Sequence, residues 1–250
     1  EEHYSPAALL AELKAKPPQF DTTVCEATLY NYIYRGDVFL VLNPERLHEK
    51  GRRHYGEKYG EQRNAARAAK GPRIDKRDPI INSRTTFGHW EMDSVVGKKG
   101  TKAALCVLTG RVTRDEIIRK MHDDTAASVV GVLDRLERRM GTTMFRQVFK
   151  SITVDNGSEF ADCKGMERSC LLPGEKRTHV YYCHPRSPGE RGSNEKQNQL
   201  IRWFFPKGTD FRKVTQKEVR RVQDWINNYP RLILDWHTSA ELFNVFLASL

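Results

Sequence analysis

The chain has 250 residues, of which 42 are Lys or Arg and 32 are Asp or Glu, so its formal net charge is +10 at pH 7. This length is enough for one large domain with a small companion, and 38% hydrophobic residues are enough for a packed core. The excess of positive charge favours a polyanionic partner, with a nucleic acid as the first candidate, because phosphate contacts release counterions. No apolar run of about eighteen residues occurs, so we expect no contact with a membrane.

The five cysteines are an odd number and include no CxxC pair. This pattern argues against a disulfide framework and against a zinc knuckle. We therefore expect reduced thiols in a cytoplasmic protein. The first residue is Glu and not Met, which suggests a chain cut from a longer protein.

Residues 1–45 predict two short helices around a turn. Ser5 followed by proline is typical of a helix start, and Thr23 followed by Glu26 predicts a capping box that opens the second helix. The pair resembles a helix-turn-helix, and a small helical hairpin without a ligand is the alternative. In the first case the second helix would present three side chains to a DNA groove, namely Thr28, Asn31 and Arg35.

Residues 46–85 have little periodicity and many basic side chains, so they predict a basic linker. Such a segment is either a solvated run or a track along a phosphate backbone. In the second case Arg52 and Arg53 would contact DNA.

The remaining residues, 86–250, predict an α/β domain. Short segments rich in Val, Ile and Leu, separated by turns, predict a three-stranded antiparallel meander and two further strands, at 89–97, 103–109, 116–121, 149–154 and 179–183. Amphipathic patterns predict helices that flank this mixed sheet, at 125–140, from 192 onward, at 215–228 and at 239–250.

Three acidic residues occupy distinctive positions in these elements. Asp93 lies within the first strand, on the same face as Glu91, where an unpaired carboxylate would be costly. Asp155 follows the fourth strand, where ligands bind in open α/β sheets, although Asp-Asn-Gly is also ordinary turn chemistry. Glu195 lies in the first turn of the helix after Gly192, where the helix dipole favours a negative charge. Glu91 is either a partner in the site or one half of a salt bridge.

Three carboxylates brought together would repel one another, at about 4 kcal/mol per pair at 4 Å with an effective dielectric near 20. One or two Mg²⁺ ions would reverse the sign of this interaction, because hard cations take oxygen ligands. Two such ions can activate a hydroxyl and stabilise the leaving oxygen at a phosphodiester. The three acids are therefore candidates for metal-dependent phosphodiester chemistry.

Four motifs in this order resemble the insertion-sequence 30 family of DDE transposases, which have a retroviral-integrase-like catalytic core. They are GHWEMD (88–93), TVDNGSEF (153–160), HPRSPGERGSNEKQN (184–198) and FFPKGTDF (204–211). The resemblance implies a ribonuclease-H-like fold for residues 86–250 and a catalytic, metal-binding triad of Asp93, Asp155 and Glu195. It also implies cleavage and strand transfer of double-stranded DNA at terminal inverted repeats and target DNA, with two Mg²⁺ ions, which Mn²⁺ would replace. A homo-oligomer on DNA, at the nucleoid in a bacterial cytoplasm, is the expected setting.

Two departures from the family pattern affect these expectations. The spacer between Asp155 and Glu195 is longer than the resemblance predicts, with extra residues in 161–178, and His184 stands where an acid is expected.

Three polar residues after Glu195 are expected to hold the scissile phosphate and the flanking DNA, namely Asn198, Arg202 and Lys207.

Three other functions remain open from the sequence. A non-enzymatic DNA-binding regulator derived from a transposase would need the N-terminal helices and the basic linker but not the acids. A structural protein built on a retired nuclease core would bind neither DNA nor metal. A ribonuclease that acts on RNA/DNA hybrids would use the same acids on another substrate.

Overall fold

A computed structural model describes residues 4–16, 22–36, 38–39, 71–185, 187, 190 and 192–250, without the side chain of Glu195. The chain divides into two compact units. The smaller comprises Glu1–Arg63 with Tyr229–Thr238, and the larger comprises Asn64–Asn228 with Ser239–Leu250. Segment 229–238, which we expected within the domain 86–250, therefore groups with the N-terminal residues.

The smaller unit contains α1 (Pro6–Ala15), α2 (Glu26–Arg35) and η5 (Leu232–Leu234). The Ser5 hydroxyl caps α1, as expected, by accepting from the Ala8 N–H at 3.2 Å. The predicted capping box at Thr23 is wrong: the residue that caps α2 is Cys25, and its side chain makes no capping hydrogen bond. A threonine followed by a glutamate three residues later thus identifies the helix but not its first residue.

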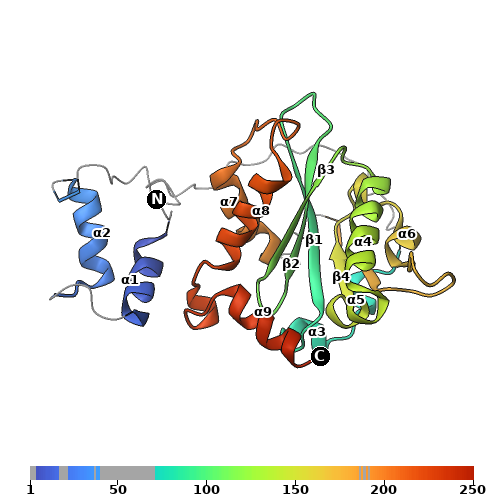
Figure 1. The fold of residues 1–250 in the computed structure, drawn as a ribbon, viewed down its shortest axis with the longest axis horizontal. Helices are drawn as coiled ribbons and strands as arrows, with labels where there is room; N and C mark the ends of the chain where they lie inside the picture. The colour runs from blue at the N-terminus through green and yellow to red at the C-terminus, as the bar shows by residue number, and fades with distance from the viewer. Residues whose placement is uncertain are drawn as a thin grey trace. The chain divides into compact units, whose positions relative to one another are not determined.

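The larger unit is built on a five-stranded mixed sheet in the order β3-β2-β1-β4-β5. Figure 1 labels β1 to β4 of this sheet. Strands β1, β2 and β3 form an antiparallel meander, and β4 and β5 continue the sheet in parallel to β1. Their bounds are β1 (His89–Val96), β2 (Ala104–Gly110), β3 (Glu116–Met121), β4 (Ser151–Val154) and β5 (His179–Tyr182). This confirms the expected α/β, ribonuclease-H-like arrangement of a meander with two further strands.

One face of the sheet is apolar along all five strands. Trp90 and Met92 of β1 and Ile152 of β4 pack there against α4 (Ala126–Met140) and α5 (Thr142–Val148). The Thr125 hydroxyl caps α4 by accepting from the Ser128 N–H. Phenylalanines of α9 (Ser239–Ala248) complete this layer by stacking on Phe87. The alternation of apolar residues in β1 therefore determines which face is the main core.

The opposite face is divided between an apolar half and a polar half. Over β2, β3 and the C-terminal end of β1 it is apolar, and it is covered by α7 (Gly192–Phe204) and α8 (Gln216–Asn227). Figure 1 shows these two helices on the side of the sheet away from α4 and α5. Over β1 and β4 the outward side chains are polar, with Glu91 and Thr153 paired in register. This polar half carries the candidate site.

Residues 71–84 cover part of the polar half, although we expected them within the linker 46–85. They contain η2 (Ile74–Lys76) and α3 (Ile80–Ser83), and Arg77 donates to the Thr153 hydroxyl at 2.8 Å. They also contact β5, because the Tyr182 N–H donates to the Pro72 carbonyl at 2.9 Å. Arg77 is buried, although a hydropathy pattern assigns an arginine to solvent. Residues 46–70, with Arg52 and Arg53, lie outside the described residues.

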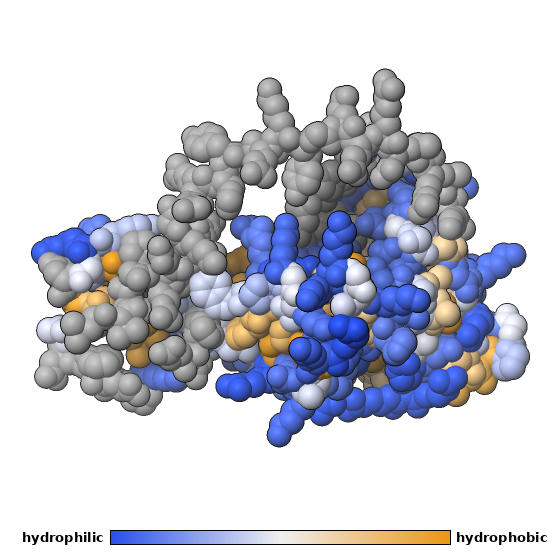
Figure 2. All heavy atoms as spheres, turned by 90° about the horizontal axis from the view of Figure 1, so that it is seen from above, coloured by the Kyte–Doolittle hydropathy of each residue, from blue (hydrophilic) through white to orange (hydrophobic). Residues whose placement is uncertain are grey.

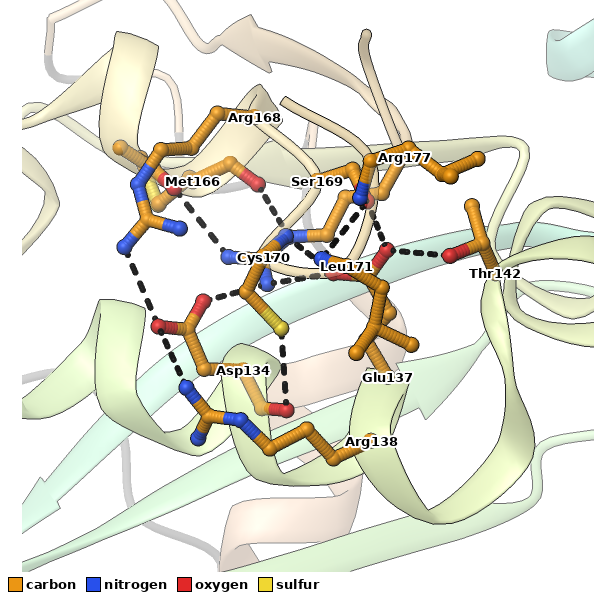
Figure 3. Close-up of polar contacts among 12 residues, drawn as sticks. Asp134, Glu137, Arg138, Thr142, Met166, Arg168, Ser169, Cys170, Leu171 and Arg177 are labelled. Atoms are coloured by element: carbon orange, nitrogen blue, oxygen red, sulfur yellow. Dashed lines mark hydrogen bonds and ion pairs between the residues drawn. The ribbon is translucent and has the colours of Figure 1, made fainter. Parts of the chain in front are cut away.

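The segment after Asp155 forms η3 (Ser158–Phe160), α6 (Cys163–Glu167) and a loop that leads to β5. The fully buried Arg177 fastens this segment to α4, with Nη1 at 2.6 Å from Asp134 and 3.2 Å from Glu137 (Figure 3). Figure 3 also shows Arg168 directed at Asp134, at 3.1 Å. The segment between Asp155 and β5 is therefore attached to α4.

The visible surface is mostly hydrophilic (Figure 2). Figure 2 shows one face of the molecule on which hydrophilic side chains predominate and hydrophobic ones form small separate patches. Among the described residues, no helix has the length and the apolar composition that crossing a membrane requires.

Candidate active site

Asp93 lies on β1, and Asp155 directly follows β4, the adjacent parallel strand. The register of β1 and β4 ends at Glu91 opposite Thr153, and the two aspartates each follow two residues later. A shift of two residues preserves the face, and neighbouring strands lie about 4.8 Å apart. Both aspartates are half-buried. The fold therefore brings these two carboxylates to one edge of the sheet, on the side that carries α7.

Each aspartate is oriented by hydrogen bonds. Asn198 of α7 donates from Nδ2 to Oδ2 of Asp93 at 2.7 Å, and the Ser94 N–H donates to Oδ1 at 3.0 Å. Asp155 accepts at Oδ1 from the Gly157 N–H at 2.8 Å, which closes the turn after β4. These bonds restrict rotation of both carboxylates.

The helix α7 follows β1 in matched steps. The Asn194 N–H donates to Glu91 at 3.2 Å, and Arg202 Nη2 donates to the Val96 carbonyl at 2.9 Å. With the Asn198 bond to Asp93, the contacts recur every four residues on the helix and every two or three on the strand. Four helical residues rise about 6 Å and two strand residues about 6.6 Å, so the two elements stay aligned. Glu195, next to Asn194, is thereby placed in the first turn of α7.

Glu91 anchors the start of that helix. Its side chain is fully buried, and Arg111 Nη1 donates to its Oε1 at 2.6 Å, while its Oε2 accepts from Asn194. This confirms the salt bridge as the role of Glu91. The turn between β2 and β3 adds a second anchor, because Arg114 donates to Ser193 and its carbonyl accepts from Gln197 at 3.1 Å.

Two acids near the aspartates were not among the predicted site residues. The Ser94 hydroxyl lies 3.3 Å from Asp124 and 3.2 Å from Glu159. Burial raises the pKa of both carboxyls, and the charge of Asp155 raises both further. Glu159 is part of the TVDNGSEF motif and could have been identified there. Asp124 lies in the turn before α4, and no motif around it in the sequence indicates a role in the site.

The donor atoms at this edge suit a hard divalent cation. Two carboxylates are close together, and Oδ1 of Asn198 is buried without a hydrogen-bond partner. Carboxylate and amide oxygens are the ligands that Mg²⁺ takes in proteins. Among the described residues no group of three or more His, Cys, Asp or Glu side chains could hold a metal, and the side chain of Glu195 is outside that set.

The remaining predicted site residues lie in several places. Asn31 and Arg35 are exposed on α2, and Thr28 on the same helix is half-buried. Arg202 is half-buried, and its Nη2 donates to the Val96 carbonyl. Lys207 is exposed in the turn after α7. Asn198 and Arg202, which we expected to hold the phosphate and the flanking DNA, therefore both donate hydrogen bonds to β1.

No family model matches the chain. A transposase for insertion sequence element IS1086 from Cupriavidus metallidurans is 32% identical over 258 residues, which cover all of this chain and 71% of that protein. This chain belongs to the insertion-sequence transposases. The transposase InsI for element IS30C from Escherichia coli is 30% identical, over 92% of this chain and 58% of its own length. These relatives confirm the resemblance that the four motifs indicated.

Two integrase-related proteins also match this transposase. A putative integrase, ORF3 of Spiroplasma virus SpV1-R8A2 B, is 31% identical over 96% of this chain and 69% of its own length. Among solved structures, a simian T-cell lymphotropic virus intasome in complex with PP2A regulatory subunit B56 gamma aligns with a TM-score of 0.46 and 17% identity. That alignment covers 62% of this chain and 53% of the other.

Proposed function

We propose that this transposase cuts and joins DNA with Asp93, Asp155 and Glu195 as the carboxylates that hold divalent metal ions. The observation that carries the proposal is the position of Asp93 and Asp155, two residues beyond a registered pair on adjacent parallel strands. Glu195 follows Asn194, whose N–H is bound to the same strand as Asp93. Transposases and integrases of this kind generally use divalent metal ions.

The chain's own residues prepare this edge of the sheet for catalysis. Asn198 and the Ser94 N–H fix the carboxylate of Asp93, and the Gly157 N–H fixes that of Asp155. Bound Mg²⁺ would supply Lewis-acid activation of a water or a 3′-hydroxyl and stabilisation of the leaving oxygen. Because the aspartates are held in advance, little reorganisation accompanies the reaction.

The substrate that fits this family and this charge is double-stranded DNA. We propose that the terminal inverted repeats are cut first and that the freed 3′-hydroxyl then attacks target DNA, within a homo-oligomer on the DNA. The net charge of +10 supports this, as does the exposure of Asn31 and Arg35 on α2. Lys207, Arg52 and Arg53 are proposed further contacts to the DNA backbone.

A cleavage assay tests the proposal. Labelled terminal-repeat DNA is incubated with the protein and Mg²⁺ or Mn²⁺, with Asp93→Asn, Asp155→Asn and Glu195→Gln as variants. Glu175→Gln removes an exposed carboxylate of the α6–β5 loop and serves as the matched control. We expect metal-dependent cleavage by the wild type and the control. In each of the three variants the cleavage rate should fall by at least about 100-fold, which is the order of magnitude that the removal of one catalytic group causes. Undiminished cleavage by the variants would disprove the triad, and DNA binding without cleavage by the wild type would favour a regulator.

A further inference from the structure

A cavity of about 420 Å³ is lined by Arg77 and Arg111, which hydrogen-bond to Thr153 and Glu91 on the polar half of the sheet. Three arginines from different segments line it: Arg77 between η2 and α3, Arg84 after α3, and Arg111 after β2. Asp75 and Glu190 complete its charged lining. The volume is within the range of small-molecule sites and exceeds what a phosphate group needs.

Two of these arginines are buried and incompletely satisfied. Arg77 and Arg111 are 5% and 4% exposed, and the Nε of each is buried without a hydrogen-bond partner. Burial lowers the pKa of both guanidinium groups, and the charge of Arg111 lowers that of Arg77 further. Burying an N–H of a cation without an acceptor costs free energy. The fold nevertheless keeps these two donors without an acceptor.

Arg84 reaches the same cavity from a strained backbone. Its φ of 55° and ψ of 33° are left-handed, a conformation that a residue with a Cβ rarely adopts. Its charge is close enough to lower the pKa of Arg111. Backbone outliers of this kind concentrate at ligand sites, where they aim a side chain.

Among the described residues, the two acids that line the cavity form their ion pairs with His184 and not with these arginines. Asp75 and Glu190 are held by His184, with Nε2 and Nδ1 each at 2.8 Å from a carboxylate oxygen. Within the described part of the chain, only Arg111 among the three arginines forms an ion pair, with Glu91. An anion is therefore the ligand that would satisfy the free donors.

We propose that this cavity, which we call the arginine pocket (Arg77, Arg84 and Arg111), binds a backbone phosphate of the DNA strand that approaches the acids. Arg77 and Arg111 attach to the sheet at Thr153 and Glu91, two residues before Asp155 and Asp93. Two strand residues span about 7 Å, the axial distance of about two phosphates in a duplex strand. The inference rests on the proposed action on DNA, which supplies the ligand.

The test measures binding without catalysis. Fluorescence anisotropy with a labelled terminal-repeat duplex in EDTA, over a range of salt concentrations, compares the wild type with Arg84→Ala and Arg84→Gly. Arg139→Ala removes one exposed charge from α4, on the other side of the sheet, as the matched control. We expect both Arg84 variants to bind about tenfold more weakly and to lower the slope of log K against log salt by about 0.9. An unchanged slope, or the same loss in the control, would overturn the proposal.

The two Arg84 variants separate binding from folding. Glycine suits the left-handed backbone better than arginine, so Arg84→Gly should melt at or above the wild-type temperature while it binds DNA more weakly. A second arm adds inorganic phosphate without DNA and follows the melting temperature. A rise in the wild type that Arg84→Gly lacks supports phosphate recognition. Phosphate stabilisation combined with an unchanged DNA slope would assign the pocket to a free anion and overturn the DNA assignment.

The binding assay is also independent of the proposed catalysis. If the Arg84 variants show the expected lower salt slope but the wild type never cleaves DNA, the metal-dependent reaction is disproved and the proposal for the arginine pocket stands. Metal-dependent cleavage with an unchanged slope in the Arg84 variants would do the reverse.

Discussion

Asn198 donates a 2.7 Å hydrogen bond to Asp93 from the same helix that carries Glu195 three residues earlier. One helical turn before that bond, the Asn194 N–H is bound to Glu91, two residues before Asp93 on β1. The helix with the third acid is thus fastened to the strand with the first acid at two successive points. The relative placement of the candidate catalytic residues depends on these contacts.

Asn198→Ala should slow cleavage without weakening DNA binding. The variant removes a hydrogen bond to a carboxylate, which is worth about 1.5–3 kcal/mol, so we expect the rate to fall by about tenfold or more. Asn198→Asp should be worse, because it places a second negative charge against Asp93. Single-turnover cleavage and anisotropy in EDTA measure the two effects separately. Gln199→Ala alters the exposed neighbouring position and should behave as the wild type. Equal cleavage rates for the Asn198→Ala variant and the wild type would show that Asp93 needs no such support.

Glu91→Ala should destabilise the larger unit. The change leaves the buried Arg111 without its carboxylate and the Asn194 N–H without its acceptor, and breaking a buried pair costs about 3–5 kcal/mol. Glu91→Gln keeps an acceptor for the N–H and should lose less. Urea unfolding monitored by tryptophan fluorescence gives both values. If both variants unfold at the same urea concentration as the wild type, the anchor has no energetic role.

The stability of the larger unit should fall in acid through Glu137. Burial by itself would raise the pKa of this carboxyl, but hydrogen bonds from Ser169, the Cys170 N–H and Thr142 outweigh it and lower the pKa to about 2. A depressed carboxyl pKa contributes stability above its ordinary value of 4.5 and loses it as the pH falls toward 2. The contribution is on the order of 3 kcal/mol.

Denaturation of the wild type and Glu137→Gln between pH 2 and pH 6 isolates this effect. The variant should be less stable at pH 6, and the difference between the two proteins should shrink as the pH falls. A difference that stays constant over this range would exclude Glu137 as the titrating group.

His184 should titrate above the ordinary histidine value of 6.5. Hydrogen bonds to Glu190 and Asp75 raise the pKa of its ring, and both ring nitrogens must carry protons to serve two carboxylates. The stability that it contributes is therefore complete below pH 6.5 and is lost as the pH rises through the raised pKa. NMR titration of the ring protons measures it. Glu190→Gln should move the pKa back toward 6.5, whereas a wild-type value at or below 6.5 would contradict the bridge.

Strand periodicity and motif spacing predicted most of the sheet and two of the three candidate acids in their places. The alternation in β1 correctly put Glu91 and Asp93 on one face, opposite Trp90 and Met92. These features are visible in the sequence because each depends on residues close together in the chain.

The remainder of the site depends on partners that are distant in sequence. Nothing near Arg77 shows that it is buried against Thr153, and nothing near Arg177 shows that it reaches Asp134. A hydropathy pattern assigns such arginines to solvent, because it cannot register a charge that is buried with its partner. The same limit hid the bonds of Asn194 to Glu91 and of Asn198 to Asp93, because the partners are distant in the sequence.

The matched contacts of α7 with β1 also determine where the length of this chain can vary. An insertion of one residue between Asn194 and Asn198 would turn the helix by about 100°, and one between Glu91 and Asp93 would move Asp93 to the opposite face of the sheet. Segment 161–178 is under no such restriction, because Arg177 fastens it to α4 and not to the acids. Since β1 and the turn before β3 position α7, extra residues between Asp155 and Glu195 can be gained or lost in evolution without displacing either acid.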